Sequence, residues 1–407
     1  MRLWIVNHYA KTSDSAGGSR HVSLARELAA QGHEVTIIAS SYDAKTGVNK
    51  LDASDSVWSR QCLSERLSFI WIRVPSYSGN DTTRVKNMLA FAWRVLRRTG
   101  LQDLPSPDAV LGSSPHLLAA AAAERLAHRY KAAFLFEVRD LWPETLVALG
   151  GMSSSHPAII GMSFLERRLY QRARKVITLL PQSIEYIARR GASPSKIHWI
   201  PNGIALDQAG EPAPPKGESD SFTIMYAGAH GRANGLDTVL QSAKYMETIN
   251  PRVKYRLVGD GPEKPKLMQQ AKDMGLRNVA FEPAVPKTQI FDVLRQADAF
   301  IMPLRDSPVF KWGVSPNKLF DYMAVGRPIV YAINAPNDPV AEARAGVSIR
   351  ADDPRAMAEA IDKLARLSMP ERVEMGFRAR EYVEEHHDIK RLAKTLEAIV
   401  LEAIRGV

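Results

Sequence analysis

The sequence predicts an α/β protein that contains two doubly wound parallel sheets. Short apolar runs alternate with helical patterns along the chain, which is typical of proteins whose parallel strands are joined by helices. This pattern stops at Leu206–Asp220, a segment rich in Pro, Gly and Ala, and then starts again. The length of 407 residues also suits two domains better than one core.

An N-terminal domain is expected over residues 1–205. Its first strand precedes a loop that contains Gly17 and Gly18, and a helix follows over Ser19–Gln31. Glycines directly before a helix let backbone N–H groups approach an anion, although two adjacent glycines also suit a plain tight turn. Neither domain has the G-x-G-x-x-G spacing, which disfavours a dinucleotide cofactor. The expected strands of this domain are Leu3–Val6, Val35–Ala39, Phe69–Val74, Ala109–Gly112, Ala133–Val138 and Lys175–Leu179.

A linker is expected over residues 206–220 and a C-terminal domain over residues 221–388. The final segment, residues 389–407, contains a helix at Ile389–Ile404 that is apolar on one face, and we expect it to pack back on the N-terminal domain. The expected strands of the C-terminal domain are Thr223–Gly228, Tyr255–Val258, Val279–Phe281, Ala299–Pro303 and Pro328–Val330. Its expected helices are Leu236–Tyr245, Glu263–Met274, Lys287–Gln296 and Asn317–Met323.

The excess positive charge lies in the first half of the chain. Residues 1–205 hold 26 Lys and Arg against 16 Asp and Glu, whereas residues 206–407 hold 28 of each, so the whole net charge of +10 is N-terminal. This asymmetry indicates an anionic partner, either nucleic acid, an anionic membrane surface or a phosphorylated lipid. The single cysteine, Cys62, excludes an internal disulfide. With no signal-peptide pattern and no apolar run of membrane-spanning length, we expect a cytoplasmic protein.

The strongest functional motif follows the expected strand Ala299–Pro303. A polar loop leads to Ser315-Pro316-Asn317, which opens a helix. Ser and Asn can cap free N–H groups at a helix start, and Pro suits the first turn, so a purely structural interpretation is available. A functional interpretation is that the same N–H groups face a ligand, because open α/β sheets bind ligands at such carboxyl-end loops.

Two charged residues in this helix favour the functional interpretation. Lys318 lies in the first turn, where its charge adds to the helix dipole at a position suited to a diphosphate. Asp321 lies about one turn further along, where a carboxylate can accept hydrogen bonds from a ribose diol. The pattern therefore predicts a nucleotide site at this helix start.

The segment Asn317–Pro328 (NKLFDYMAVGRP) resembles the nucleotide-sugar motif of the retaining GT-B glycosyltransferases of glycosyltransferase family four. More narrowly, the chain resembles bacterial transferases that build O-antigen and capsule repeat units, including the L-fucosamine transferase type. The resemblance covers nearly the whole chain. Further matching segments are Gly17–Val35, Phe136–Glu144, Ile200–Ile204, Met225–Asp237 and Leu257–Pro262.

The resemblance implies a GT-B fold, with two Rossmann-like domains that face a cleft. It implies transfer of a hexosyl or N-acetylaminosugar group from a UDP-sugar, with retention of anomeric configuration, to a saccharide on an undecaprenyl-diphosphate carrier. Such an enzyme would act in O-antigen, capsule or lipopolysaccharide biosynthesis at the inner face of the cytoplasmic membrane. The resemblance also implies chemistry without a metal or other cofactor, and the sequence shows no metal-ligand spacing.

The chain departs from the family pattern at the positions that hold the diphosphate. The second acidic residue of the family's Glu-x7-Glu motif is Asp321 here, and the first falls on Gly313. The family's Arg and Lys positions after the first C-terminal strand fall on Ala229 and Asn234. We expect nearby cations to replace them, although each is also compatible with a solvated loop. The donor-binding candidates are Gly17, Gly18, Gly228, Arg232, Asn234, Lys311, Ser315, Pro316, Asn317, Lys318 and Asp321.

The catalytic candidates are Arg139 and Asp140, which follow a predicted strand of the N-terminal domain. Many relatives have a His-Asp pair at this place. Asp140 is expected to orient the acceptor hydroxyl or to act as a base, and Arg139 to hold an acceptor phosphate. A structural salt bridge is the alternative, because a paired Arg and Asp often form one. Trp142 can stack on a sugar or lie in the core. His8 and His21 are weaker candidates, because most isolated histidines are structural.

Residues Arg84–Gly100 (RVKNMLAFAWRVLRRTG) hold five basic residues and no acidic one. Helical spacing places Val85, Met88, Leu89, Ala92, Val95 and Leu96 on one face, and Arg84, Asn87, Phe91, Arg94 and Arg98 on the other. Such a helix can lie in a membrane interface, or it can be a domain helix with a basic outer face. The charge asymmetry favours the membrane. The expected contact residues are Arg84, Lys86, Trp93, Arg94, Arg97 and Arg98.

Two alternatives from other classes stay open at this point. An epimerase of the UDP-N-acetylglucosamine type shares the implied fold, but it requires acid and base side chains around the cleft. A nucleic-acid-binding protein would explain the basic N-terminal half, but the sequence contains no nucleic-acid-binding motif, so we expect no nucleic-acid partner.

Overall fold

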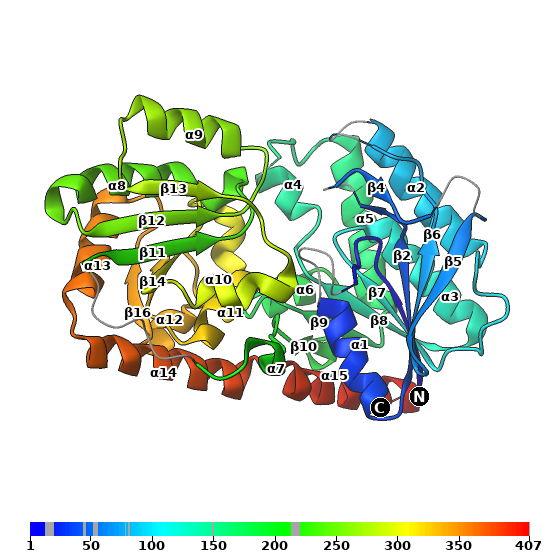
Figure 1. The fold of residues 1–407 in the computed structure, drawn as a ribbon. Helices are drawn as coiled ribbons and strands as arrows, with labels where there is room; N and C mark the ends of the chain where they lie inside the picture. Colours follow the sequence, from blue (N-terminus) through cyan, green and yellow to red (C-terminus); the bar gives the residue numbers. More distant parts are fainter. Residues whose placement is uncertain are drawn as a thin grey trace. The chain divides into compact units, whose positions relative to one another are not determined.

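The structure is a computed structural model that describes residues 1–12, 20–43, 46–51, 56–77, 79, 82–148, 150–212 and 220–406. The chain divides into two compact units (Figure 1). Unit 1 contains Met1–Pro201 and Ile389–Val407, and unit 2 contains Asn202–Asp388. Each unit has its own largely parallel sheet, which confirms the predicted fold class. The expected cleft between the units stays a prediction.

Unit 1 is built on an eight-stranded sheet in the order β10-β9-β8-β7-β1-β2-β6-β5. The strands are parallel except for the edge strand β5, which pairs antiparallel with β6 and which the sequence analysis did not identify. The parallel strands are nearly continuous apolar runs because helices cover both faces of the sheet. The strands are β1 (Arg2–Val6), β2 (Glu34–Ser40), β5 (Trp58–Ser64), β6 (Leu67–Ile72), β7 (Ala109–Ser113), β8 (Ala133–Val138), β9 (Lys175–Thr178) and β10 (Ile197–Trp199). A separate two-stranded sheet pairs β3 (Tyr42–Asp43) with β4 (Val48–Asn49).

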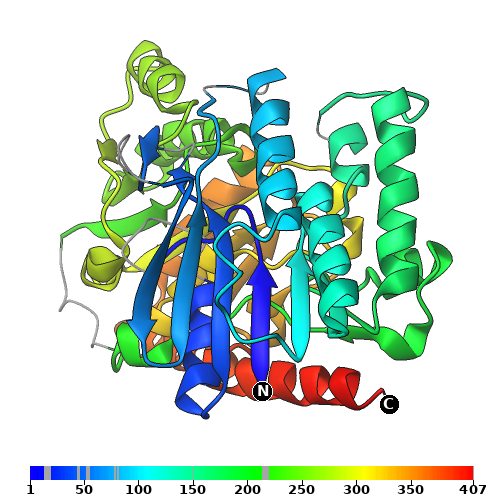
Figure 2. The ribbon, with the colours of Figure 1, turned by 90° about the vertical axis from the view of Figure 1, so that its right-hand side faces the viewer.

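Two groups of helices cover the sheet of unit 1. The connections from β1 to β2 and from β7 to β8 run in opposite directions along the sheet, so right-handed crossovers place their helices on opposite faces. Helix α1 (Arg20–Ala30) packs with α15 (Ile389–Arg405). Helices α2 (Thr82–Leu96), α3 (Leu117–Tyr130) and α5 (Pro157–Arg172) lie side by side in the other group (Figure 2). Shorter helices are α4 (Glu144–Ala148), α6 (Ile184–Arg189) and η1 (Pro194–Lys196).

The C-terminal helix α15 is an integral part of unit 1. Its apolar face is buried against α1 and strands β7, β8 and β9. Polar contacts along its length add to this packing: Glu397 lies 2.5 Å from His33 Nε2, and Glu402 accepts from Lys175 Nζ at 2.8 Å. Near its end, the Ala403 carbonyl accepts from Arg174 at 2.7 Å. The helix therefore lies on the unit where the sequence analysis expected it.

Unit 2 contains a six-stranded parallel sheet in the order β13-β12-β11-β14-β15-β16. The strand order reverses between β11 and β14, and open α/β sheets bind ligands at such a switch point. The strands are β11 (Phe222–Ala227), β12 (Val253–Val258), β13 (Val279–Glu282), β14 (Ala299–Pro303), β15 (Ile329–Ala332) and β16 (Gly346–Ile349). The helices are α7 (Leu206–Ala209), α8 (Leu236–Ile249), α9 (Lys264–Asp273), α10 (Ile290–Leu294), α11 (Asn317–Val325), α12 (Pro339–Glu342), α13 (Pro354–Arg366) and α14 (Met369–His386), with short 3-10 turns η2 (Arg232–Asn234), η3 (Lys287–Gln289) and η4 (Pro308–Trp312). The expected linker thus includes α7, which packs on α11.

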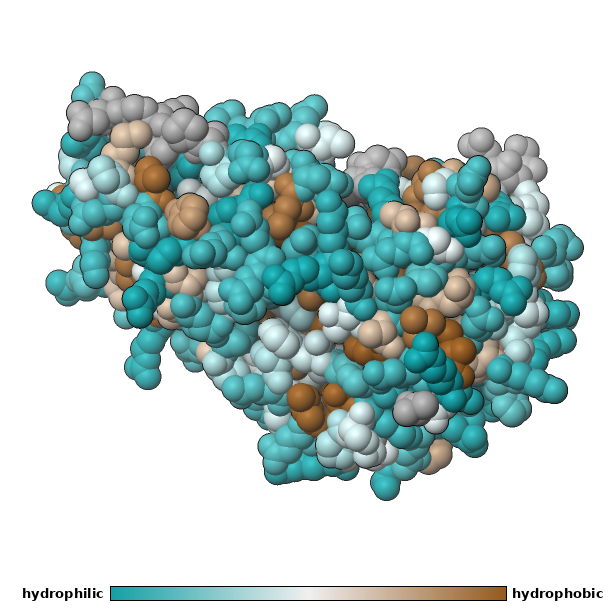
Figure 3. Space-filling model, turned by 90° about the horizontal axis from the view of Figure 1, so that it is seen from below, coloured by the Kyte–Doolittle hydropathy of each residue, from teal (hydrophilic) through white to brown (hydrophobic). Residues whose placement is uncertain are grey.

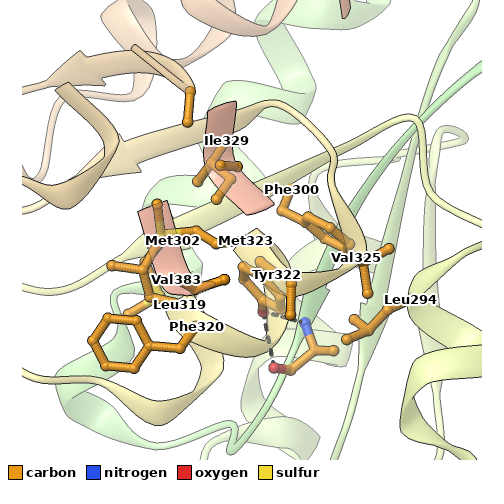
Figure 4. Packing of buried hydrophobic residues seen from close by; sticks show 14 of the residues in the cluster. Leu294, Phe300, Met302, Leu319, Phe320, Tyr322, Met323, Val325, Ile329 and Val383 are labelled. Carbon is orange, nitrogen blue, oxygen red and sulfur yellow. Dashed lines mark hydrogen bonds between the residues drawn. The ribbon is translucent and has the colours of Figure 1, made fainter. Parts of the chain in front are cut away.

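Helix α11 is held in the core of unit 2 on both sides of the switch point (Figure 4). The Tyr322 ring stacks on Phe300 of β14 with the ring centroids 4.3 Å apart. Its hydroxyl donates to the Ala227 carbonyl at 2.9 Å and accepts from the Ala227 N–H at 2.7 Å, at the end of β11. Gly326, with φ of 73°, then ends the helix in the left-handed conformation that favours glycine. The start of α11 therefore has a defined position beside the ends of β11 and β14.

The buried side of α2 does not coincide with either of the two faces given by its helical spacing. Asn87, Phe91 and Val95 are buried, because Asn87 donates to the Pro75 carbonyl at 2.6 Å and Phe91 packs on His8. Arg94 is half-buried and donates to the Arg73 carbonyl. The alternative of a basic outer face is therefore wrong. The helix also ends at Leu96 instead of continuing to Gly100.

The outer face of α2 is apolar. Its four large exposed side chains are Val85 at 54%, Leu89 at 51%, Trp93 at 58% and Leu96 at 39%. By contrast, the molecular face in Figure 3 is mainly hydrophilic, and its apolar residues form small separate patches. Among the described residues, no helix is long and apolar enough to cross a membrane.

Candidate active site

The loops after β11 and β12 pack backbone to backbone at the carboxyl edge of the sheet of unit 2. A Cβ atom on Gly259 would lie 1.9 Å from the Gly228 carbonyl oxygen, so only glycine fits there. The His230 N–H donates to the Asp260 carbonyl at 2.9 Å, which joins the two loops further along. The loop after β12 therefore fixes the conformation of the loop after β11, where the nucleotide was expected.

Lys318 is the cation that the structure brings to this loop. Its Nζ donates to the Tyr226 hydroxyl at 2.9 Å and to the Asn234 side-chain oxygen. Gly228 lies directly against it, since a Cβ at this glycine would be 3.4 Å from Lys318 Cε. Burial lowers the pKa of Lys318 to about 7. The predicted residues Gly228, Asn234 and Lys318 thus form one cluster, in which Asn234 orients the lysine.

The first turn of α11 presents backbone donors beside Lys318. Pro316 is the N-cap residue, and no side chain among the described residues caps the helix. The Leu319 N–H bonds to the Pro316 carbonyl at 3.1 Å, whereas the N–H groups of Asn317 and Lys318 have no partner in the described part of the chain. The first N–H groups of any α-helix have no partner within the helix, and together with the helix dipole they favour an anion. The structural alternative, in which Ser315 caps the helix, is not formed, because the Ser315 hydroxyl accepts instead from the Asn202 N–H at 2.8 Å. Asn317 is exposed at the same turn.

Asp321 lies on the second turn of α11, with its side chain 18% exposed. Burial raises its pKa, and the nearest cation is Lys287 Nζ, 4.0 Å from Oδ1. A partly buried carboxylate with an open edge can accept hydrogen bonds from a diol, as the sequence motif predicts. At the position of the motif's first acidic residue this chain has Gly313, whose φ of 98° favours glycine.

The other two predicted cations lie in more open surroundings. Arg232 is exposed on η2, where it lines a small pocket with Asp237, Glu263 and Arg305. Lys311 is exposed on η4, with its Nζ 5.0 Å from the centre of the Trp312 ring. Their roles in donor binding stay predictions. Gly17 and Gly18 lie outside the described residues.

A buried ion network lies at the carboxyl ends of the strands of unit 1. Arg20 Nε donates to Glu137 Oε1 at 2.8 Å, and His21 Nε2 lies 2.6 Å from Oε2. Ser113 also donates to Oε2, at 2.7 Å, and the Asn7 amide nitrogen donates to His21 Nδ1 at 3.1 Å. Burial raises the pKa of Glu137, but His21 and Arg20 outweigh this effect and hold it well below its usual range. Glu137 is therefore an ionised carboxylate that holds the start of α1 against β8.

Arg139 and Asp140 follow β8, beside this network. Both backbone N–H groups point to the Ser114 hydroxyl, at 2.8 Å and 3.4 Å. Asp140 is exposed, although the surrounding protein raises its pKa by desolvation. The Nε of Arg139 is buried without a hydrogen-bond partner among the described residues, and no ion pair joins the two side chains there. The structural salt bridge considered above is thus not formed, and both side chains can engage a ligand.

The two histidines considered as weaker candidates are structural. His21 belongs to the Glu137 network, and His8 is buried with its Nδ1 3.0 Å from Nδ1 of His116. Burial lowers the pKa of His8 to about 3, so this ring is neutral at physiological pH. Trp142 is half-buried. Among the described residues, no three His, Cys, Asp or Glu side chains gather as a metal site would require.

The sequence analysis missed three residues that organise these sites. Glu137 is a charged residue inside an apolar strand, which is a recognisable sign of a buried partner. Arg20 and Asn202 show no such sign, because their partners come from distant segments: Arg20 donates to the Ile200 carbonyl at 3.0 Å, and Asn202 bonds to Ser315. Only folding brings these segments together.

Comparison with known proteins gives a glycosyl transferase match for each half of the chain. Residues 16–203 match the family described as Glycosyl transferase 4-like domain, and residues 221–366 match the family described as Glycosyl transferases group 1. The chain is 24% identical over 314 residues to WcaI of Escherichia coli (strain K12), which is named a colanic acid biosynthesis glycosyl transferase. This match covers 74% of this chain and 75% of WcaI.

Two solved structures share the fold. Sucrose-phosphate synthase from Thermosynechococcus elongatus has a TM-score of 0.74 at 18% identity, over 100% of both chains. The complex of HepE from Anabaena with UDP-glucose has a TM-score of 0.63 at 13% identity, over 98% of this chain and 100% of that chain. At these identities the likeness shows the fold and not the substrate.

Proposed function

We propose that this chain, a glycosyltransferase with the GT-B fold, transfers a sugar from a UDP-sugar to a lipid-linked saccharide in bacterial surface-polysaccharide biosynthesis. Its place in polysaccharide synthesis is supported by the colanic acid relative. The observation that carries the donor assignment is Lys318, which lies beside the uncapped start of α11 at the switch point of the sheet. UDP as the nucleotide is supported by the UDP-glucose complex of a protein with the same fold.

The proposed donor site stabilises the leaving diphosphate with fixed donors. The N–H groups of the first turn of α11 and the Lys318 ammonium meet the negative charge that develops when the sugar–phosphate bond breaks. Asp321 accepts hydrogen bonds from the ribose diol. We further propose that the reaction retains the anomeric configuration and that the sugar is a hexose or an N-acetylaminosugar.

The proposed acceptor groups lie in unit 1. Asp140 accepts a hydrogen bond from the attacking hydroxyl and orients it, and its raised pKa makes it a better base than a fully hydrated carboxylate. The guanidinium of the half-buried Arg139 binds a phosphate oxygen of the undecaprenyl diphosphate carrier. The Glu137 network beneath them holds the end of β8 in place.

A transfer assay tests the proposal. Calorimetry with UDP-, GDP-, ADP- and dTDP-sugars first identifies the donor nucleotide, and we expect a UDP-sugar to bind. The radiolabelled donor is then incubated with synthetic polyprenyl-diphosphate saccharides, and the label is expected in the lipid extract. Interconversion of UDP-sugars without an acceptor and without transfer would instead support the epimerase alternative, against which the family matches argue.

We expect turnover to be independent of divalent metal ions. The diphosphate charge is met by backbone N–H groups and Lys318, as described above, so the reaction needs no bridging cation. Initial rates measured in excess chelator should equal those measured with magnesium. A rate that falls to background in chelator and returns with magnesium or manganese would contradict this prediction.

We expect Asp321→Ala to weaken UDP binding about tenfold without unfolding unit 2. Hydrogen bonds to a charged acceptor contribute about 1.5–3 kcal/mol, and one of this size is lost for the ribose diol. Asp292→Ala on α10 is a suitable control, because that side chain is 76% exposed. Equal affinities for wild type and a folded Asp321→Ala protein, measured by calorimetry, would remove Asp321 from the site.

We also propose that unit 1 docks on the anionic inner face of the cytoplasmic membrane through α2. The apolar outer face formed by Val85, Leu89, Trp93 and Leu96 is flanked by exposed Lys86 and Arg97. Apolar side chains flanked by cations suit the headgroup region of an anionic bilayer. The cation of Arg97 also lies over the Trp93 ring, 4.6 Å from its centre. Arg84, Arg94 and Arg98 contribute less than expected, because all three are half-buried.

A further inference from the structure

The chain passes into unit 2 at Asn202 and leaves it at Asp388. We call residues 202–204 and 387–388 the crossover segments, and they are hydrogen-bonded to each other. The Ile204 N–H donates to the His387 carbonyl at 2.9 Å, and Ile204 forms an isolated parallel bridge with Asp388. The Asn202 carbonyl lies 2.9 Å from His387 Nδ1. Since a carbonyl only accepts, Nδ1 carries the proton. Burial lowers the pKa of His387 to about 4, so the ring stays neutral and this bond persists at physiological pH.

The same crossover residues hold the turn that opens α11. The Asn202 backbone N–H donates to the Ser315 hydroxyl at 2.8 Å, and its side-chain Nδ2 donates to the Ser315 carbonyl at 2.6 Å. The His387 ring stacks on Phe320 of α11, with the ring centroids 3.8 Å apart. Asn202 and His387 are 5% and 2% exposed, so these contacts are made in a dry environment.

These contacts help to set where the first N–H groups of α11 point. Pro316 is the N-cap residue and cannot donate a backbone hydrogen bond, so the turn is held through the residues before it. Asn337 bonds the N–H and the carbonyl of Val314, both at 2.9 Å, and Asn202 bonds the hydroxyl and the carbonyl of Ser315. A hydrogen-bond donor to a buried carbonyl is costly to lose, because the carbonyl is then left unsatisfied.

We propose that Asn202 is a positioning residue for the donor diphosphate: it sets the Ser315 turn so that the first N–H groups of α11 face the phosphates. The inference rests on the proposed donor site, and it adds a residue that lies on the crossover segment rather than in the nucleotide loops. It follows that diphosphate affinity depends on the backbone geometry of the crossover at Asn202, to which the turn is bonded.

The test uses Asn202→Ala in the full chain, with UDP and uridine as the two probes. The variant is expected to bind UDP about tenfold more weakly, as loss of an aligned set of donors predicts, while uridine affinity changes less than about twofold. Asn250→Ala is the matched control, because Asn250 makes a comparable side-chain bond in the same unit, to Asp362 at 3.0 Å. Equal loss for UDP and uridine, or no loss for UDP, would overturn the proposal.

A measurement without nucleotide separates this proposal from the donor assignment. Hydrogen exchange of the amides of residues 315–320 should be faster in Asn202→Ala than in wild type, with the strands of unit 2 unchanged. If wild type binds another nucleoside diphosphate instead of UDP, the assignment of UDP as the donor nucleotide fails. The role of Asn202 is then still decided by the exchange result and by comparing that diphosphate with its nucleoside in wild type and Asn202→Ala. Unchanged exchange in residues 315–320 would overturn it.

Discussion

Replacing Lys318 by Met is expected to weaken UDP binding by about 30-fold or more. The substitution keeps an unbranched side chain one atom shorter but removes the charge that meets the diphosphate. Truncating one partner of a desolvated, hydrogen-bonded charge pair costs about 2–5 kcal/mol, which corresponds to this loss of affinity. Lys318→Met should also leave the Tyr226 hydroxyl and Asn234 without their shared donor, so both the rate and the affinity fall.

The affinity of wild type for UDP should also decrease as the pH rises above about 7. In the free protein burial lowers the pKa of Lys318 to about 7, so the ammonium form is the major one only below that pH. A bound diphosphate stabilises the ammonium form, and binding at pH 8 or 9 therefore takes up a proton. Calorimetry in two buffers of different ionisation enthalpy measures this uptake, which Lys318→Met should abolish.

The lowered pKa of Lys318 also makes the stability of the folded protein depend on pH. The folded pKa of about 7 lies below the unfolded value of 10.5, so between these values the unfolded chain binds more protons than the folded one. The contribution of Lys318 to stability therefore rises with pH across this interval. Lys363→Met on α13 is the control, because that side chain is exposed and is not among the predicted site residues. If Lys318→Met, like Lys363→Met, binds UDP as well as wild type does at pH 6, Lys318 does not hold the diphosphate.

Replacing Leu89 and Trp93 together by Glu is expected to abolish binding to anionic vesicles. Both side chains are more than half exposed on the outer face of α2, so the change should not disturb the core. Full burial of a large apolar side chain contributes about 1.5–3 kcal/mol, and about half of this is available here because each side chain is already partly covered. Each added carboxylate is also repelled by the anionic surface. The summed loss is about three orders of magnitude in the partition coefficient.

Co-sedimentation with vesicles that contain phosphatidylglycerol measures this effect. Ile249→Glu on α8 is the matched control, because Ile249 is 39% exposed but belongs to unit 2. Wild-type binding should weaken at 1 M salt, where the Debye length is about 3 Å, and the residual binding reflects the apolar face. Sedimentation of the double variant at the wild-type level would show that α2 is not the anchor.

Much of the fold follows from local patterns in the sequence. Strands such as β1 and β14 are short apolar runs bounded by polar loops, and their order along the chain specifies two parallel sheets. The edge strand β5 was not identified, because its residues are mostly exposed and the segment lacks the apolar run that marks a buried strand. Its pairing with β6 defines it as a strand. The spacing of the motif likewise predicted that Lys318 and Asp321 lie on the first two turns of one helix, as they do in α11.

The orientation of side chains required the folded structure. The helical spacing of α2 gave two faces but not the one that is buried, and Asn87 and Phe91 are buried because Pro75 and His8 offer them partners. Ser315 looked like a helix cap, yet Asn202 engages it from 113 residues away. Local sequence determines which residues can form strands, helices and a nucleotide loop, whereas hydrogen bonds and packing between distant segments decide which face is buried and which polar groups stay free for a ligand.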